Sequence, residues 1–224
     1  MSLPANPRVA IVIPAKNEAD TIVAVVEGVR GFALPVVVDD GSTDGTGKLA
    51  ADAGADVVRH AQSRGYDGAL QAGFRRASEL GVDVAASFDA DGQFAVADLQ
   101  RVLAPVLAGE AEVCLGIRPE PARFAEWLFG LYGRWRFGIP DVLCGVKAYA
   151  METYRRLASP HPGRSIGTEP ALAALRSGVR SRAVPVHVRP RQGTAPRFGS
   201  GLRANARILH ALADAVMADL RGKR

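Results

Sequence analysis

The sequence lacks the marks of several protein classes. The sequence has no run of about 18 apolar residues of the kind that forms a transmembrane helix. Residues 1–8 lack the charged region, the apolar region and the cleavage site of a signal peptide. The only two cysteines, Cys114 and Cys144, sit in apolar stretches, so we expect reduced core residues rather than a disulfide. These absences predict a cytoplasmic protein, peripheral to the cytosolic face of a membrane if it contacts one.

Two further absences narrow the chemistry. The histidines are scattered and form neither a His-Glu-x-x-His motif nor a Cys/His cluster, which argues against zinc. The segment Pro14–Glu18, which follows the first expected strand, contains no glycine. Dinucleotide-dependent dehydrogenases and sugar nucleotidyltransferases place a glycine-rich phosphate loop there, so both classes are disfavoured.

Charge is unevenly distributed. The chain has a net charge of +5, but residues 175–224 hold eleven Arg or Lys against only Asp214 and Asp219, a net +9. The preceding residues carry 17 basic and 21 acidic side chains, a net −4. An acidic body with a basic end suggests different partners for the two parts. No recognition motif supports nucleic acid as one of them.

Hydrophobic periodicity predicts a single α/β domain of 224 residues with a mostly parallel central sheet flanked by helices. Short β-branched runs alternate with stretches that place apolar residues at helical spacing. The expected strands are 8–13, 34–38, 55–59, 82–88, 111–117, 142–149 and 182–188, and the expected helices are 18–30, 46–53, 66–80, 96–108, 124–137 and 168–177.

The chain ends in an expected amphipathic helix. Its apolar face is predicted to contain Ile208, Leu209, Leu212, Ala213, Val216, Met217 and Leu220. With its arginines and lysine, this helix is suited to rest on an anionic membrane, or alternatively to pack on the sheet with its charges in solvent.

Ligands bind open α/β sheets at the carboxyl ends of the strands, where three loops here are rich in polar residues. One of them, Asp89-Ala90-Asp91-Gly92-Gln93, offers only oxygen ligands, which suits Mg²⁺ or Mn²⁺ shared with substrate phosphates. We expect all three loops to meet in one cleft: Pro14–Glu18, Asp39–Thr46 and Asp89–Gln93.

The second loop begins with Asp39 and Asp40, whose carboxylates suit contacts with a nucleobase and ribose hydroxyls. The alternative is a turn rich in Asp and Ser that caps the following helix, which we favour for Ser42, Thr43 and Asp44.

These motifs together resemble family-2 glycosyltransferases. The likeness rests on Val12–Glu18, Val38–Thr46 and Asp89–Gln93 and covers nearly the whole chain. It is most similar to the branch of dolichyl-phosphate mannose and polyprenyl-phosphate glucose synthases, because Arg64–Ala69 resembles that branch's glycine-rich turn beside the donor. The resemblance implies the GT-A fold, with residues 1–118 binding the nucleotide sugar and residues 119–224 binding the acceptor.

The resemblance also implies roles for individual residues. Asp89, Asp91 and Gln93 match metal-binding positions, with Asp91 also counted as catalytic, and Arg118 matches a position that meets the acceptor phosphate. Arg134, or Arg136, matches a second arginine on the acceptor side. The positions expected to bind the nucleotide sugar are Pro14, Asn17, Glu18, Asp39, Asp40 and Gly68.

One departure from the branch lies late in the chain. The branch usually shows a loop of the form Arg-x-x-x-Gly-x-Ser-Lys that closes over the diphosphate, whereas Arg191-Gln192-Gly193 here leads to Arg197 without the Ser-Lys pair. Arg191 and Arg197 are the expected cations of this loop, because the planar guanidinium suits phosphate oxygens.

Two acceptors remain open. A lipid phosphate is already anionic and attacks the anomeric carbon without a base, by a single displacement that inverts configuration as the family does. A glycan hydroxyl requires a carboxylate base, for which Glu169 is the first candidate and Asp141 the second. Glu169 has an alternative role as an acid in the first turn of a helix. The alternative from another functional class is a non-catalytic protein that binds a nucleotide sugar or scaffolds a partner.

Overall fold

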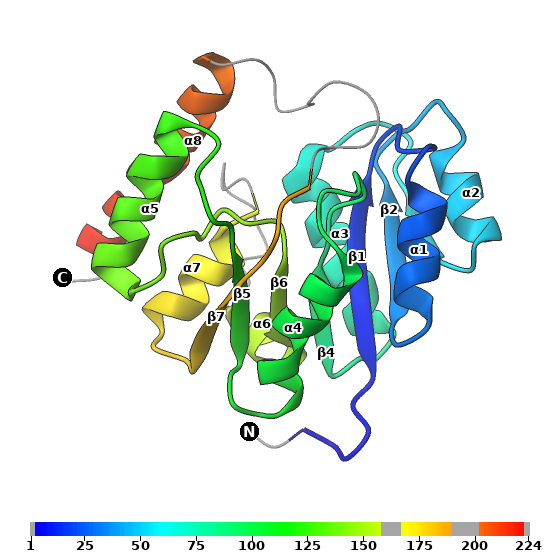
Figure 1. Ribbon diagram of the computed structural model, residues 1–224, viewed down its shortest axis with the longest axis horizontal. Coiled ribbons are helices and arrows are strands. Elements are labelled where there is room, and N and C mark those ends of the chain that lie inside the picture. The colour runs from blue at the N-terminus through cyan, green and yellow to red at the C-terminus, as the bar shows by residue number, and fades with distance from the viewer. Residues whose placement is uncertain (1–2, 158–166, 190–201, 222–224) are drawn as a thin grey trace.

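A computed structural model describes residues 3–157, 167–189 and 202–221 of the chain. The chain alternates strands and helices along most of its length, as the periodicity predicts (Figure 1). The strands are β1 (Val9–Ala15), β2 (Leu34–Asp39), β3 (Asp56–Arg59), β4 (Val84–Ser87), β5 (Val113–Ile117), β6 (Lys147–Ala150) and β7 (Ser181–Pro185). The helices are α1 (Ile22–Arg30), α2 (Thr46–Asp52), α3 (Gly65–Glu79), α4 (Val96–Leu107), α5 (Phe124–Phe137), α6 (Met151–Leu157), α7 (Glu169–Arg176) and α8 (Leu202–Arg221).

The strands form one sheet in the order β3-β2-β1-β4-β6-β5-β7. Every neighbouring pair is parallel except the two that involve β6, which runs antiparallel to β4 and to β5. The prediction of a mostly parallel sheet flanked by helices is therefore confirmed. Helix α6, which follows β6 without a turn, was not predicted.

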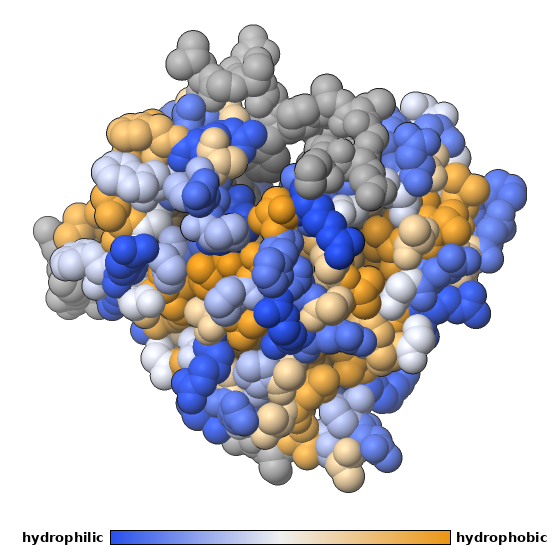
Figure 2. Space-filling view, viewed as in Figure 1, coloured by the Kyte–Doolittle hydropathy of each residue, from blue (hydrophilic) through white to orange (hydrophobic). Residues whose placement is uncertain are grey.

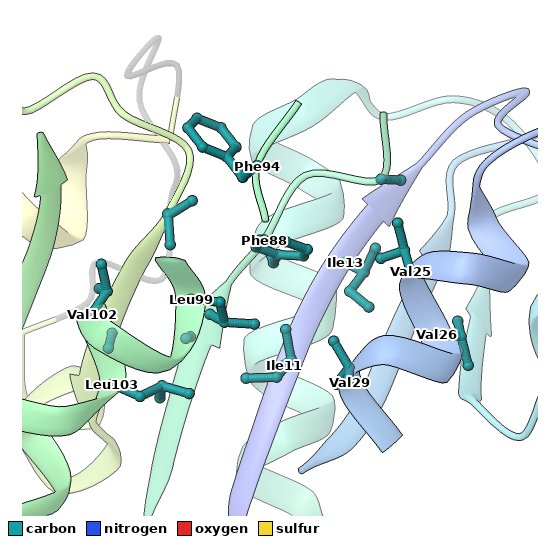
Figure 3. Packing of buried hydrophobic residues seen from close by; sticks show 14 of the residues in the cluster. Ile11, Ile13, Val25, Val26, Val29, Phe88, Phe94, Leu99, Val102 and Leu103 are labelled. Carbon is teal, nitrogen blue, oxygen red and sulfur yellow. The ribbon is translucent and has the colours of Figure 1, made fainter. Parts of the chain in front are cut away.

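The sheet is covered on both faces because its strands alternate. In β1, Ile11 and Ile13 point to a cluster formed with α1 and α4, whereas Ala10 and Val12 point to a second cluster on the opposite face. Figure 3 shows the first cluster, in which α1 and α4 close over β1. The second cluster contains side chains of α3, α5, α7 and α8.

Close packing of α3 against β1 depends on Gly73. A Cβ atom at this position would lie 2.2 Å from Cγ1 of Val12. The absent side chain lets the helix approach the strand closely.

The apolar face of α8 differs from the predicted one. Ile208 is buried and Leu212 half-buried, but Leu209, Val216, Met217 and Leu220 are exposed, by 62% in the case of Leu220. The small residues Ala204, Ala211 and Ala215 supply the rest of the buried face, because α8 packs on α5 and small side chains let two helices approach closely.

The cysteines are as predicted. Cys114 and Cys144 are both free and buried. Burial raises the pKa of each thiol to about 12, which keeps both protonated and unreactive.

Candidate functional site

Three loops at the carboxyl ends of β1, β2 and β4 meet at one edge of the sheet. The three strands are neighbours and parallel, so their loops leave in the same direction. Thr21 Oγ1, after β1, donates to the carbonyl of Ala90 after β4, at 2.6 Å. Asn17 N donates to Ser42 Oγ in the loop after β2, at 2.9 Å. The expected convergence of the three loops is therefore present.

The first two loops are joined by reciprocal hydrogen bonds. Asn17 adopts a left-handed backbone with φ of 48°, and its side-chain oxygen accepts a bond from Thr43 N at 2.8 Å. Glu18 N donates to Thr46 Oγ1 at 2.8 Å, and Asp44 accepts bonds from Ala19 N and from Thr46. The loop after β2 thus holds the loop after β1, and both are ordered before any ligand arrives.

Asp39 ends β2 with its carboxylate buried at this edge. It accepts hydrogen bonds from Ser42 N at 2.9 Å and from Arg59 Nε at 3.2 Å. Gly47 faces the same group, since a Cβ atom there would lie 2.3 Å from Asp39 Oδ2. These two donors leave part of the acceptor capacity of Asp39 for a ligand.

Asp40 has a different environment. Its Oδ1 accepts from His60 Nδ1 and Arg64 N, both at 2.7 Å, and its Oδ2 accepts from Ser63 Oγ at 2.6 Å and Gly65 N at 2.9 Å. Burial would raise the pKa of Asp40, but the four donors lower it overall.

A carboxylate offers about four lone pairs, and all those of Asp40 have protein partners. This arrangement fixes the first turn of α3 below the sheet edge and leaves no acceptor for the base or ribose contact that the sequence suggests. We therefore assign Asp40 to holding α3 and retain Asp39 for the nucleotide.

The paired carboxylates follow β4. Asp89 Oδ1 accepts a hydrogen bond from the Tyr66 hydroxyl at 2.9 Å, and Asp91 Oδ1 accepts one from Gln93 N at 3.1 Å. Burial first and the neighbouring Asp91 carboxylate second raise the pKa of Asp89 to about 6. A cation bound beside Asp89 would offset this repulsion between the two carboxylates.

Within the described ranges, no group of three or more His, Cys, Asp or Glu side chains is placed to hold a metal ion by itself. Mg²⁺ and Mn²⁺ do not need such a cage, because they commonly bind one or two carboxylates and complete their shell with water and substrate phosphates. Asp89 and Asp91 supply carboxylate oxygens on one loop after β4, so this pair fits a divalent cation shared with a diphosphate.

Gln93 belongs to the same loop, which is tied to the segment after β7. Its carbonyl accepts a hydrogen bond from Arg189 N at 2.8 Å, and Phe94 forms a bridge with Val188. Asp98, in α4, adds a bond from His187 N at 3.1 Å. The loop Asp89–Gln93 and the start of α4 are thereby hydrogen-bonded to the segment after β7.

Arg118, after β5, is already paired. Its Nε lies 2.8 Å from Asp141 Oδ2, its NH2 atom 3.1 Å from Asp141 Oδ1, and its NH1 atom 3.2 Å from Glu126 Oε2. Asp141 also accepts bonds from Arg118 N and Leu143 N. This cluster ties β5 to α5 and to the segment before β6.

The same cluster bears on Asp141 as a base. Burial would raise the pKa of Asp141, but the hydrogen bonds and positive charge of Arg118 lower it overall. A carboxylate whose oxygens are both occupied and whose basicity is reduced does not suit proton abstraction. Of the two candidate bases, only Glu169 keeps that assignment.

Glu169 is the first residue of α7, and its side chain is half-buried. Its place in the first turn of α7 is the one that the alternative role expects. The preceding turn is fixed, since the Gly167 carbonyl accepts a hydrogen bond from Lys147 Nζ at 3.1 Å. The backbone position of Glu169 at the start of α7 is therefore defined.

The remaining predicted residues lie on three elements and in one segment outside the described residues. Pro14 is half-buried in β1, Gly68 lies inside the first turns of α3, and Arg134 is exposed on α5. Arg136 pairs instead with Asp219 of α8, at 2.8 Å. Two expected diphosphate cations, Arg191 and Arg197, lie outside the described residues.

Two residues near the carboxylates are not predicted from the sequence. Tyr66 lies in the turn Arg64–Ala69, and its contact with Asp89 joins residues 23 positions apart in the chain. Lys147, which is 3% exposed, lies inside an expected strand and has no predicted role in the site. A lysine within an otherwise apolar run could have indicated such a role, because an ammonium group is rarely buried without a partner.

Comparison with known proteins agrees with this geometry. Residues 10–140 match the family described as Glycosyl transferase family 2. A polyprenol monophosphomannose synthase of Mycolicibacterium smegmatis is 31% identical over 222 residues, covering 88% of this chain and 83% of that protein. An undecaprenyl-phosphate mannosyltransferase of Micrococcus luteus is 29% identical over 223 residues, covering 89% and 90%. Glycosyltransferase AglJ of Haloferax volcanii is 32% identical over 209 residues, covering 84% of this chain but 65% of that protein.

Solved structures show the same fold. Glucosyl-3-phosphoglycerate synthase of Mycobacterium tuberculosis, crystallised with Mn²⁺, uridine diphosphate and glucosyl-3-phosphoglycerate, superposes with a TM-score of 0.75 at 21% identity, over 94% of this chain and 80% of that one. The same enzyme with Mg²⁺ and uridine diphosphate gives 0.75 at 20% identity, with the same coverage. The chain thus has the GT-A fold and belongs to glycosyl transferase family 2, and it is a glycosyltransferase.

Proposed function

We propose that the chain transfers a sugar from a nucleotide diphosphate sugar to a polyprenyl phosphate, in a single displacement that inverts configuration and depends on Mg²⁺ or Mn²⁺. The observation that carries this proposal is the pair Asp89 and Asp91 at the end of β4, beside the ordered loops of β1 and β2. Relatives named for transfer to polyprenol and undecaprenyl phosphates support the acceptor class.

The donor lies along the edge of residues 1–118 in this proposal. Pro14, Glu18 and Asp39 border the nucleotide, and Asn17 keeps their loops together through its bond with Thr43 N. Gly68, in the first turns of α3, stays proposed as a contact of the donor. Asp39 is retained as the acceptor of base or ribose hydrogens because its carboxylate is only partly occupied.

Asp89, Asp91 and Gln93 would hold the cation. A divalent ion bound there supplies Lewis-acid stabilisation of the negative charge on the departing nucleotide. The residues of the chain contribute position, since the carboxylate loop is attached to Thr21 on one side and to Arg189 on the other. Such fixed placement lowers the reorganisation needed during transfer.

The acceptor lies on the side of residues 119–224. A phosphate oxygen needs no base, so the requirement is a positive environment that brings the anion to the anomeric carbon. Arg118 supplies charge from inside its carboxylate cluster, and Arg134 is exposed on α5. Arg191 and Arg197, outside the described residues, stay proposed as the cations that meet the diphosphate.

A membrane surface is the proposed source of the lipid acceptor. Helix α5 exposes Phe124, Trp127, Leu131 and Trp135 at helical spacing, and Trp135 is 79% exposed. Figure 2 shows hydrophobic residues among hydrophilic ones on the surface over α5. No helix in the described ranges is both long and apolar enough to span a bilayer. Tryptophans flanked by arginines suit peripheral contact with an anionic leaflet.

A transfer assay tests the proposal. Radiolabelled nucleotide sugars, including guanosine and uridine diphosphate sugars, are incubated with undecaprenyl phosphate and Mn²⁺, and the label is extracted into organic solvent. The proposal expects label in the organic phase only when both lipid and metal are present. Label that transfers to an added oligosaccharide and stays in water would favour the glycan acceptor, with Glu169 as base, and overturn the lipid assignment.

A further inference from the structure

Tyr66 lies between two parts of the site that are distant in sequence. It occupies the first turn of α3, and its hydroxyl donates to Asp89 Oδ1 at 2.9 Å. The bond therefore fixes one oxygen of Asp89.

Gly167 supports the Tyr66 ring from behind. A Cβ atom at Gly167 would lie 2.7 Å from Cε1 of Tyr66, so the ring packs directly on this backbone. Gly167 itself is held at both polar groups, because its N–H donates to Asp67 and its carbonyl accepts from Lys147 Nζ. The ring consequently packs on a backbone segment that is itself held in place.

Asp89 is confined from the opposite side by Gly145. A Cβ atom there would lie 2.1 Å from Asp89 Oδ2 and 2.7 Å from Cγ. The carbonyl of Gly145 is held in turn by Ser87 Oγ, at 2.7 Å. The carboxylate therefore sits in a slot with the Tyr66 hydroxyl at one oxygen and a bare backbone at the other.

We propose that Tyr66 is the positioning residue for Asp89, which it orients as a ligand for the divalent cation. This inference rests on the proposed function, because it assigns a second contact to a carboxylate that would bind the metal. Hydrogen bonds to ligating carboxylates set their direction and basicity, and removing such a partner typically lowers metal affinity or activity about 10- to 100-fold.

The test uses Tyr66→Phe, which removes the hydroxyl and keeps the ring on Gly167. The matched control is Tyr132→Phe, because Tyr132 also donates to an aspartate at 2.9 Å, Asp219, but does so between α5 and α8. Mn²⁺ binding is measured in the presence of uridine diphosphate by the electron paramagnetic resonance signal of free Mn²⁺. We expect the dissociation constant to rise about tenfold or more for Tyr66→Phe and to stay unchanged for Tyr132→Phe.

A second pair of variants approaches Asp89 from the other side. Gly145→Ala places a methyl group where Asp89 Oδ2 lies, whereas Gly31→Ala adds one in open space, with nothing within 4 Å. We expect Gly145→Ala to weaken Mn²⁺ binding about tenfold and Gly31→Ala to leave it unchanged. Thermal unfolding of all four variants establishes that they are folded.

The outcomes separate the two proposals. If the unaltered chain binds Mn²⁺ and both Tyr66→Phe and Gly145→Ala bind it equally well, the positioning role is overturned and the proposed function stands. No Mn²⁺ binding by the unaltered chain, with or without uridine diphosphate, would overturn both. Weaker binding in both variants, with both controls normal, supports the role assigned to Tyr66.

Discussion

Different interactions stabilise two regions of the molecule. One is the sheet edge formed by the loops after β1, β2 and β4, called the donor edge here, and the other is the helical side formed by α5 and α8. At the donor edge, short side chains bond to backbone amides, as Asp40 does with Arg64 N and Gly65 N. Around α5 and α8, arginines pair with carboxylates, and Asp219 alone receives Arg136, Arg176 and Tyr132. One region is ordered by bonds of fixed geometry, the other by longer side chains and charge.

This difference suits the two tasks. Backbone amides have little freedom, so the loops after β1, β2 and β4 keep their shape with or without a ligand. The helical side exposes apolar side chains, and ion pairs of long side chains join α5 and α8 in addition to their apolar packing. In the proposed function, the first kind of surface suits a soluble nucleotide sugar and the second suits a lipid delivered by a membrane.

The largest effect is expected where the donor edge carries chemistry. Asp91→Asn keeps the size of the side chain but removes a charge that would hold the cation, so we expect kcat to fall on the order of 1000-fold with Tm nearly unchanged. Asp83→Asn is the control, because Asp83 precedes the opposite end of β4 and bonds to Arg8 N. Full metal-dependent turnover by Asp91→Asn would contradict the assigned role.

The cluster of Arg118 is expected to respond in stability. Asp141→Asn removes the bidentate partner of a mostly buried arginine, and we expect the free energy of unfolding to fall by about 2 kcal/mol. The control is Asp52→Asn in the exposed pair with Lys48, expected to cost under about 0.5 kcal/mol. Chemical denaturation measures both. Stability unchanged but turnover abolished would instead restore Asp141 as a base.

Membrane contact is expected to depend on the aromatic face of α5. The double variant Trp127→Ser with Trp135→Ser removes two exposed aromatic side chains, and we expect binding to phosphatidylglycerol-containing vesicles to weaken about tenfold. Phe32→Ser with Leu107→Ser removes two exposed hydrophobic residues elsewhere and serves as the control. Sedimentation with vesicles gives the result. Unaltered vesicle binding, together with loss of self-association, would make this face a protein interface.

The smallest effect concerns pH. Burial alone would raise the pKa of Asp219, but hydrogen bonds from Arg176 and Tyr132 and the nearby arginine charges lower it below its ordinary value. A lowered folded-state pKa contributes stability above the unfolded value of about 3.9, and this contribution is lost as the pH falls through the folded value.

Asp219→Asn should therefore be less stable than the unaltered chain near pH 7, and this difference should shrink toward about pH 3. Asp214→Asn, a change at an exposed position of the same helix, should show no such dependence. Thermal unfolding across the pH range measures it, and parallel curves for the unaltered chain and Asp219→Asn would argue against the contribution of this ion-pair network.

Much of the fold was predictable because its causes are local. The β-branched run at residues 8–13 and the spacing of Ile22, Val25, Val26 and Val29 specify a buried strand and a one-faced helix without reference to the rest of the chain. The reversal of β6 was not predictable, because strand direction depends on which edge of β4 remains open after the other elements have packed.

Roles in the site were less predictable than positions. The motif analysis placed Asp39, Asp40 and Asp91 on the converging loops, and the structure has them there. It did not distinguish Asp39 from Asp40, since the difference arises from donors about 20 residues away, such as His60 and Ser63. It also treated Arg118 and Asp141 as independent residues although they form one pair.

The sequence by itself determined the family, the α/β architecture and the loops that bear oxygen ligands, because periodicity, strand ends and short motifs are properties of neighbouring residues. Only the tertiary structure decided which carboxylates are already occupied, which face of α8 is buried, and that Tyr66 reaches Asp89. Those outcomes depend on contacts between segments far apart in the chain, whose geometry exists only once the sheet has formed and the helices have packed on it.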